Sequence, residues 1–259
     1  LAKRPAALAP LRGELRRRMA ACSLTDEAGF TRRVEAEFAA GPSYTEDETA
    51  ELARIAASFE QKNYERLPAR SEKFEAARKA DPAFAEWVAN SLFSHKVDGY
   101  AAVTVSLKPV GGVPGDMTSD QMRLFADLTD RYSLGELRVT HAQNLVLPYV
   151  KQDDLHDLWT ELAKAGLATP NVGLVTDIIS CPGLDYCALA TARSIPIAQA
   201  IATRFADKAR QADIGPLQIK ISGCINACGH HHVGHIGILG LEKRGQESYQ
   251  VTLGGDGSE

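Results

Sequence analysis

Four cysteines indicate the chemistry that this sequence could perform. They occur in two pairs, Cys181 with Cys187 and Cys224 with Cys228, which enclose five and three residues. Thiolates are soft, anionic ligands, and four of them directed at one point suit an iron–sulfur cluster or a structural zinc ion. Glycines and a proline lie beside the cysteines, where a backbone must turn sharply and approach a bulky cofactor closely. The residue types therefore predict a metal centre built from two loops.

The spacing within each pair distinguishes between kinds of metal centre. Zinc ribbons usually place two residues between the cysteines of each half, because a tight turn must direct both sulfurs at one small ion. The wider spacing here favours a cubane cluster over zinc, and buried or redox-active thiols are a third interpretation. Cys22 lies outside both pairs, and we expect it to be a small core or surface residue rather than a ligand.

The residues around the cysteines resemble the sulfite and nitrite reductase hemoprotein family. Cys-Pro-Gly-Leu-Asp-Tyr-Cys-Ala-Leu-Ala begins at residue 181, and Ser-Gly-Cys-Ile-Asn-Ala-Cys-Gly begins at residue 222. Both motifs match in the family's order, together with the strand and helix patterns that flank them. That family carries a [4Fe–4S] cluster coupled to siroheme, and it reduces sulfite to sulfide or nitrite to ammonia with six electrons.

The resemblance implies roles for individual residues. It assigns the cluster ligands to the four paired cysteines, Cys181, Cys187, Cys224 and Cys228. Cys228 would also bridge the cluster to the siroheme iron as its axial ligand. Asn226 would contact a siroheme carboxylate, with a turn-forming asparagine as an equal alternative. No catalytic residue is assigned, because the family's substrate-holding arginines and lysines would precede this chain.

Other polar residues near the cysteines could serve the same cofactors. Lys220 shares one face of an expected strand with Ser222, where a cation would neutralise a siroheme carboxylate; the alternative is an exposed charge at a sheet edge. Arg193 could pair with Asp185 or with a siroheme acid. The resembled family usually has an acidic residue at the position of His235, a departure that leaves the cysteine ligands intact.

Four histidines follow the last cysteine, His230, His231, His232 and His235. Glycines at 229 and 234 interrupt any helix that could stack their rings into a separate metal site. We expect them instead to donate hydrogen bonds to cofactor carboxylates or cluster sulfides, since such contacts tune the reduction potential.

Composition and charge exclude several other classes of protein. The formal net charge of −4, with no basic tract interleaved with aromatic residues, argues against a nucleic-acid partner. No run of eighteen apolar residues occurs, so no membrane span is expected. Five cysteines are too few for a secreted disulfide scaffold, and cluster ligands require a reducing compartment, which predicts a cytoplasmic location. The chain begins without a methionine, and we expect it to be a fragment of a longer protein.

The elements before the first cysteine predict two regions. Residues 1–95 are expected to be the helical end of a preceding siroheme-reductase domain and a linker. Residues 96–150 contain an alternating strand at 103–107, a helix that begins at the capping box of Thr118 and Gln121, and strands over 136–141 and 145–150. This order predicts half of a ferredoxin-like domain, which in the resembled family pairs with a second half.

The third region, residues 151–259, is expected to be a mixed α/β siroheme and [4Fe–4S] domain, truncated at its C-terminus. Its pattern predicts a helix over 153–165, strands that deliver Cys181 and Cys224, a helix from Cys187 that Pro196 interrupts, and a last strand over 248–253. Both cysteine loops would thus follow strands, where open α/β sheets generally hold cofactors.

The expected fold is therefore α+β, a helical segment followed by a ferredoxin-like half-domain and a mixed α/β cluster domain. The expected function is assimilatory reduction of sulfite or nitrite by a siroheme and [4Fe–4S] enzyme, with ferredoxin or a flavoprotein as electron donor; the fragment alone need not be active. The alternative is a non-enzymatic iron–sulfur electron-transfer module. A zinc-stapled structural domain is a weaker third hypothesis.

Overall fold

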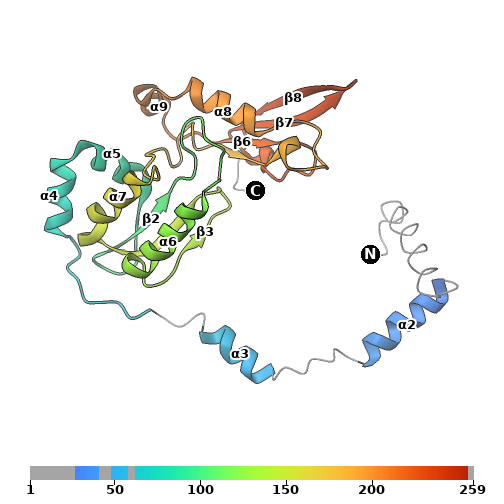
Figure 1. The fold of residues 1–259 in the computed structure, drawn as a ribbon, viewed down its shortest axis with the longest axis horizontal. Coiled ribbons are helices and arrows are strands. Elements are labelled where there is room, and N and C mark those ends of the chain that lie inside the picture. Colours follow the sequence, from blue (N-terminus) through green and yellow to red (C-terminus); the bar gives the residue numbers. More distant parts are fainter. Residues whose placement is uncertain (1–26, 41–47, 58–61, 256–259) are drawn as a thin grey trace. The chain divides into compact units, whose positions relative to one another are not determined.

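The computed structural model describes residues 27–40, 48–57 and 62–255 (Figure 1). The chain divides into two compact units, Leu1–Lys62 and Asn63–Glu259. The first unit contains the described helices α2 (Glu27–Ala40) and α3 (Glu48–Ala57), so the described part of the N-terminal segment is helical, as expected. Cys22 lies outside the described residues.

The second unit begins with two short helices, α4 (Glu72–Ala80) and α5 (Pro82–Ser91), whose boundaries follow from capping. Ser71 caps α4 by accepting a hydrogen bond from the Phe74 N–H. Asp81 ends α4 and caps α5, and Pro82 starts α5, where its missing N–H leaves no helical bond unmade.

The first sheet contains β1 (Leu92–Ser94), β2 (Tyr100–Val105), β3 (Arg138–Val139) and β4 (Leu145–Lys151) in the order β1-β2-β4-β3, with every pair antiparallel. Between β2 and β3 lies α6 (Ser119–Tyr132), and the predicted capping box of Thr118 and Gln121 forms both of its hydrogen bonds. After β4, a turn of 3-10 helix (Gln152–Asp154) leads into α7 (Leu155–Lys164).

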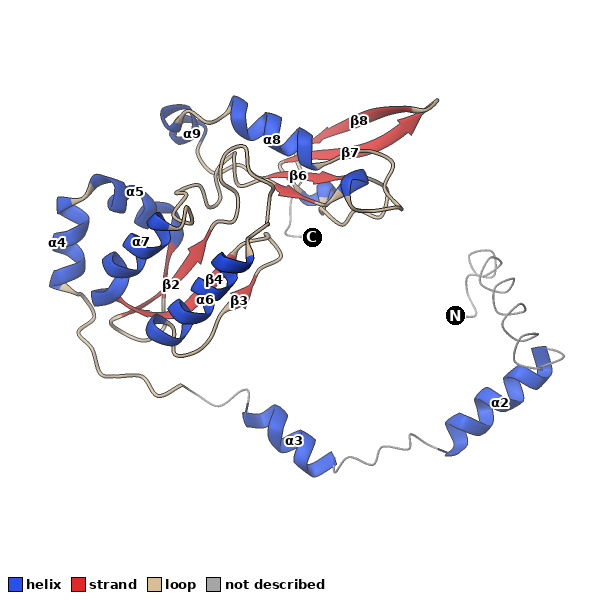
Figure 2. Ribbon diagram, viewed as in Figure 1, coloured by secondary structure: helices blue, strands red, loops and turns tan. Residues whose placement is uncertain are grey.

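The helices of this part lie beside the first sheet (Figure 2) and share one apolar core with it. Its largest fully buried side chains come from α5, α6, α7 and the strands, and include Phe84, Trp87, Phe125, Leu147 and Leu158. Burial of each such side chain stabilises the fold by about 1.5–3 kcal/mol.

The second sheet contains β5 (Ile179–Ser180), β6 (Ile219–Ser222), β7 (Ile236–Lys243) and β8 (Gln246–Leu253), in that order. The first three strands are parallel, and β8 returns antiparallel through a tight hairpin at Arg244 and Gly245, which both have positive φ. Helices α8 (Ile195–Arg204) and α9 (Lys208–Ile214) link β5 to β6. A second core joins α8 to this sheet through Ala198, Ile219, Ile221 and Ile238. The expected α+β fold class is confirmed.

One predicted element is wrong. The helix expected from Cys187 does not form; residues 187–194 are turns and bends, and α8 begins at Ile195 with Pro196 in its first turn. Proline lacks an N–H and its ring clashes with a preceding helical turn, so it starts this helix instead of interrupting one. The domain bounds 1–95, 96–150 and 151–259 stay predictions.

A buried ion pair joins the loop after β2 to the segment before β5. Lys108 Nζ lies 2.6 Å from Asp177 Oδ1, and the two side chains are only 2% and 9% exposed. The other donors to this carboxylate are Asn144 Nδ2, at 3.1 Å, and the Gly173 N–H, at 2.8 Å. Burial lowers the pKa of Lys108, and the carboxylate of Asp177 opposes that shift. The network fixes the first sheet against the second.

Candidate metal centre

Two of the predicted ligands lie at the carboxyl ends of neighbouring strands. Cys181 follows β5 directly, and Cys224 follows β6 after Gly223. Because β5 and β6 pair in parallel, both strands end at the same edge of the sheet. Cys181 and Cys224 are each 8% exposed, so both thiols are anchored within the folded unit.

The other two cysteines lie on loops nearer to solvent. Cys187 is half-buried, and its N–H donates to the Gly183 carbonyl at 2.9 Å, which closes the first loop around the 3-10 turn Gly183–Asp185. Cys228 is exposed and follows Ala227, which has a positive φ of 57°. All four are free thiols.

Hydrogen bonds at Gly223 hold the two cysteine loops together. Its carbonyl accepts from the Thr191 N–H at 2.9 Å, from the Ala192 N–H at 3.0 Å and from Thr191 Oγ1 at 3.0 Å. A Cβ at this position would lie 2.7 Å from the Ala192 oxygen and 2.8 Å from Gly183 Cα, so only glycine fits. We call these three bonds to the carbonyl the Gly223 clasp.

The sulfur of Cys181 lies beside this clasp. The Gly223 N–H donates to Cys181 Sγ at 3.0 Å, and the hydroxyl of Ser194 lies 3.4 Å from the same sulfur. Hydrogen bonds of this kind stabilise a thiolate, the form in which cysteine binds a metal. The site is thus suited to a charged sulfur even though it is buried.

The donor set fits a cluster better than a single ion. The four donors are thiols on two loops, Cys181 and Cys187 on the first and Cys224 and Cys228 on the second. A tetrahedral zinc site needs its sulfurs about 2.3 Å from one point. A four-iron cube instead offers one iron to each thiolate, so its ligands can come from two well-separated loops.

The structure contradicts one of the two interpretations of Lys220. It lies in β6, between β5 and β7, and is 6% exposed. The interpretation of Lys220 as an exposed charge at a sheet edge is therefore wrong. No described residue forms a hydrogen bond or an ion pair with its ammonium group. Asn226 is exposed between Cys224 and Cys228, and its predicted role stays a prediction.

The histidines after Cys228 occupy separate environments. His230 has a positive φ of 53°, and His231 and His232 follow it in a 3-10 turn with their rings 5.5 Å apart. His231 Nδ1 is buried and has no hydrogen-bond partner among the described residues, and burial together with His232 lowers the pKa of this imidazole. The ring of His235 instead accepts the Gln218 N–H at 3.0 Å.

Arg193 lies between two acids, and one of them is Asp185, a partner that the sequence predicted. Its Nε is 4.0 Å from Asp185 and 3.7 Å from Glu247. The Arg193 N–H also donates to Glu247 at 2.9 Å, and the Tyr249 hydroxyl lies 2.9 Å from both Glu247 Oε2 and the Arg193 carbonyl oxygen, which share its one proton. These bonds fasten the β7–β8 hairpin to the segment that follows the first cysteine loop.

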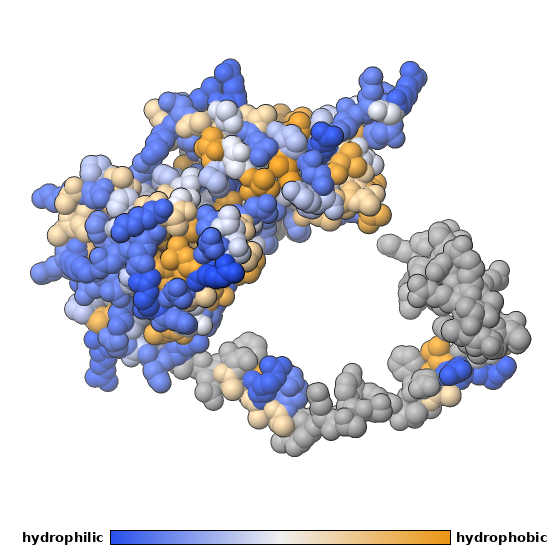
Figure 3. Space-filling model, in the orientation of Figure 1, coloured by the Kyte–Doolittle hydropathy of each residue, from blue (hydrophilic) through white to orange (hydrophobic). Residues whose placement is uncertain are grey.

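The cysteine loops carry exposed apolar side chains. On the face drawn in Figure 3, apolar residues gather over the part of the molecule that contains the second sheet. Four large apolar residues in or beside the two loops are between 41% and 85% exposed: Leu184, Tyr186, Leu189 and Ile225. A flat, largely apolar ring such as a tetrapyrrole would find a suitable surface here.

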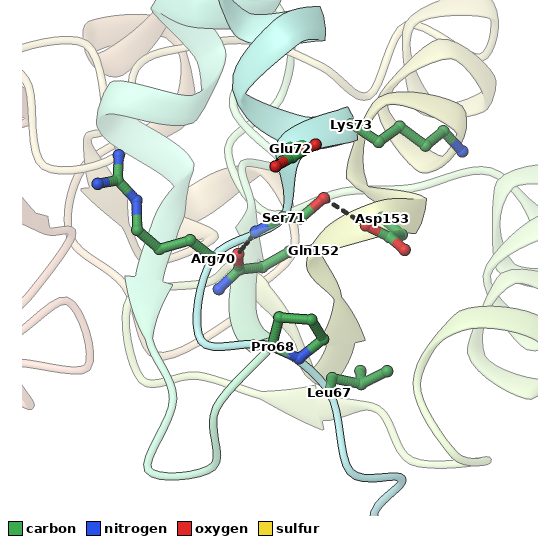
Figure 4. A pocket seen from close by; sticks show the side chains of 9 residues that line it. Leu67, Pro68, Arg70, Ser71, Glu72, Lys73, Gln152 and Asp153 are labelled. Carbon is green, nitrogen blue, oxygen red and sulfur yellow. Dashed lines mark hydrogen bonds between the residues drawn. The ribbon is translucent and has the colours of Figure 1, made fainter.

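A cavity of about 360 Å³ lies elsewhere, where the start of α4 meets the turn after β4. Gln152 and Asp153 point toward Ser71 and hydrogen-bond it (Figure 4). Neither the cysteines nor the histidines line this cavity, so it is separate from the metal centre.

Two family models match the chain. Residues 95–165 match the nitrite/sulfite reductase ferredoxin-like half domain, and residues 173–259 match the nitrite and sulphite reductase 4Fe-4S domain. Together they match more than half of the chain and include both cysteine pairs. The chain belongs to the nitrite and sulfite reductase family. This confirms the resemblance and, with it, the [4Fe–4S] cluster and siroheme that the family carries.

Several nitrite and sulfite reductases are similar to this chain. Ferredoxin–nitrite reductase of Synechococcus elongatus is 32% identical over 149 residues, which are 54% of this chain and 28% of the relative. Sulfite reductase [ferredoxin] 2 of Mycolicibacterium paratuberculosis is 30% identical over 175 residues, which are 62% of this chain and 31% of the relative. The solved structure of NirA from Mycobacterium tuberculosis aligns with a TM-score of 0.52 at 27% identity, covering 64% of this chain and 31% of NirA.

The chain spans about a third of the nitrite and sulfite reductases that it matches, between 28% and 34% of the first three relatives. Within the described residues, no helix is long and apolar enough to cross a membrane.

Two features of the site were not predicted from the sequence. Ser194 lies two residues before Pro196, a position that suggests a helix cap and gives no sign of a contact with sulfur. The Gly223 clasp joins residues more than thirty positions apart, and only the glycine itself was a visible signal.

Proposed function

We propose that this chain forms the cluster-binding part of an assimilatory, cytoplasmic reductase that converts sulfite to sulfide or nitrite to ammonia. The carboxyl ends of β5 and β6 carry Cys181 and Cys224 at one sheet edge, and this arrangement is the main support for the proposal. When bound, the [4Fe–4S] cluster and siroheme supply single-electron storage and a reactive iron. The protein supplies ligands, orientation and charge.

The four cysteines divide the task of holding the cluster. Cys181 and Cys224 are anchored by strands and by the Gly223 clasp, which fixes one side of the cluster-binding site. Cys187 and Cys228 complete the ligand set from the two loops, and exposed Cys228 is the residue that we assign as the bridge to siroheme. Asn226 lies between the two cysteines of the bridging loop, and Lys220 lies in the strand that leads to that loop. Each can donate a hydrogen bond, so we propose that both contact siroheme carboxylates.

The electron donor that we propose is ferredoxin, because the relatives from Synechococcus elongatus and Mycolicibacterium paratuberculosis are named as ferredoxin-dependent enzymes. Those names divide between nitrite and sulfite, and both substrates are small oxyanions. We therefore propose oxyanion reduction as the shared chemistry, with the two substrates to be separated by turnover assays.

The test is an absorption spectrum of the protein at its full natural length, purified without air, with iron and acid-labile sulfide assayed on the same sample. We expect tetrapyrrole bands, and iron in excess of sulfide. Cys181→Ser and Cys224→Ser should remove the cluster, while Cys22→Ser, outside both motifs, should keep it. Cys228→Ser should also lose the coupling between cluster and siroheme.

Each other outcome contradicts a defined part of the proposal. Cluster absorption without a tetrapyrrole, even when siroheme is supplied during expression, would indicate an electron-transfer module. A colourless protein that holds zinc would contradict the cluster itself. Full cluster content in the Cys181→Ser and Cys224→Ser variants would show that other residues bind the cluster.

A further inference from the structure

Ser194 places a buried hydroxyl against the sulfur of Cys181. Its side chain is completely buried, and Ser194 Oγ lies 3.4 Å from Cys181 Sγ. In the described part of the chain this hydroxyl has no other hydrogen-bond partner. The sulfur also accepts the Gly223 N–H at 3.0 Å, so two donors are directed at one cysteine.

The direction of the Ser194 bond follows from the state of the sulfur. A thiol could donate to the hydroxyl, but a metal-bound cysteine is a thiolate without a proton. Ser194 must then be the donor and Cys181 the acceptor. Bonds to charged acceptors are stronger than neutral ones, so the contact gains strength when a cluster is bound.

The position of Ser194 in the fold also points to this role. It is the residue before α8, where serine usually accepts a hydrogen bond from the helix's first N–H groups, yet its side chain makes no capping bond. Space for the hydroxyl comes from two glycines, since a Cβ on Gly183 or Gly223 would lie 2.9 Å from Ser194 Oγ. The hydroxyl is thus held toward the sulfur and away from the helix.

We propose that Ser194 donates a hydrogen bond to the Cys181 thiolate and raises the reduction potential of the cluster. The inference rests on the proposed function, in which Cys181 is a cluster ligand. Reduction adds one electron, which increases the negative charge on the ligand sulfurs. A donor at the sulfur stabilises the reduced form more than the oxidised form, so the potential rises.

The experiment is a redox titration of the cluster in the full-length holoprotein, followed by electron paramagnetic resonance. Ser194→Ala should shift the potential to a more negative value. The matched control is Ser180→Ala, which removes a buried hydroxyl from the residue next to Cys181; that hydroxyl bonds the Cys181 carbonyl at 3.1 Å and not its sulfur. The control should leave the potential unchanged.

A second variant tests whether the potential follows the strength of the hydrogen-bond donor at position 194. A thiol is a weaker donor than a hydroxyl, so Ser194→Cys should give a potential between those of wild type and Ser194→Ala. Potentials are measured only on protein that holds a cluster, so partial loading does not alter the comparison. An unchanged potential in Ser194→Ala, or an equal shift in Ser180→Ala, would overturn the inference. Loss of the cluster in Cys181→Ser would still support the proposed function in that case.

Discussion

The side-chain amide of Gln143 forms two hydrogen bonds with the backbone of Ser180, the residue before Cys181. Gln143 Nε2 donates to the Ser180 carbonyl at 2.7 Å, and the Ser180 N–H donates to Gln143 Oε1 at 2.9 Å. Gln143 lies in the bend before β4 with a positive φ of 56°, and its side chain reaches the strand that ends at Ser180. The half-domain therefore sets the position of the first predicted ligand.

Gln143→Glu should lower both stability and cluster retention. The carboxylate cannot donate to the Ser180 carbonyl, and a lost buried hydrogen bond with an unsatisfied partner costs about 1–3 kcal/mol. Urea unfolding and iron content measure the two effects. Gln199→Glu is the matched control, because the Gln199 side chain makes only one hydrogen bond to the described residues, to the exposed Gly111 carbonyl at 3.2 Å. Equal losses in both variants would contradict the assigned role.

Lys108→Met should destabilise the chain by about 3–5 kcal/mol, because it leaves the Asp177 carboxylate buried without its cation. Lys208→Met makes the same substitution in an exposed pair, where Lys208 Nζ lies 2.7 Å from Glu86 and its side chain is 67% exposed. That control should cost at most about 1 kcal/mol. Denaturant unfolding monitored by circular dichroism measures both values, and similar losses would refute the importance of burial.

Lys220→Met should reduce siroheme retention and leave the cluster in place. Loss of a charge-assisted hydrogen bond costs about 1.5–3 kcal/mol, equivalent to about 10- to 100-fold weaker binding. The ratio of tetrapyrrole absorbance to acid-labile sulfide measures the effect. Lys220→Arg keeps the charge and should retain more siroheme than the methionine variant. An unchanged ratio in Lys220→Met would show that Lys220 does not contact siroheme.

Glu247→Gln should change how stability responds to acid. The Arg193 N–H and the Tyr249 hydroxyl hold the pKa of Glu247 below its ordinary value of 4.5. A lowered carboxyl pKa contributes stability above the ordinary value, and that contribution is lost as the pH falls through the lowered pKa. Melting temperatures between about pH 3 and about pH 6 should thus fall less steeply in Glu247→Gln than in wild type. Tyr249→Phe, which removes only one donor, should lie between them; parallel curves for all three would contradict this assignment.

The sequence was informative where the signal was local. The capping box of Thr118 and Gln121 and the strands that deliver Cys181 and Cys224 are encoded by residues a few positions apart. Pro196 is a local signal with two meanings, since proline can start a helix or break one, and the choice depended on the neighbouring loop. Lys220 could be placed on a strand, but its burial depends on which strands lie beside β6.

Contacts between distant residues could not be predicted. Gln143 and Ser180 are thirty-seven positions apart, and Lys108 and Asp177 are sixty-nine positions apart. These polar and charged residue types are as compatible with an exposed surface position as with a buried hydrogen-bond network. Their partners follow only from the packing of the two sheets.

The Gly223 clasp has a consequence for how this centre tolerates change in chain length. Because three bonds from Thr191 and Ala192 to one carbonyl hold the two loops together, the distance between the loops does not depend on how many residues connect Ala192 to Gly223. The exposed connection between α8 and α9, at Ala206 and Asp207, could accept inserted residues while the ligand positions stay unchanged. A search for such centres in other sequences should therefore fix the residues around each cysteine pair and leave the gap between the pairs free.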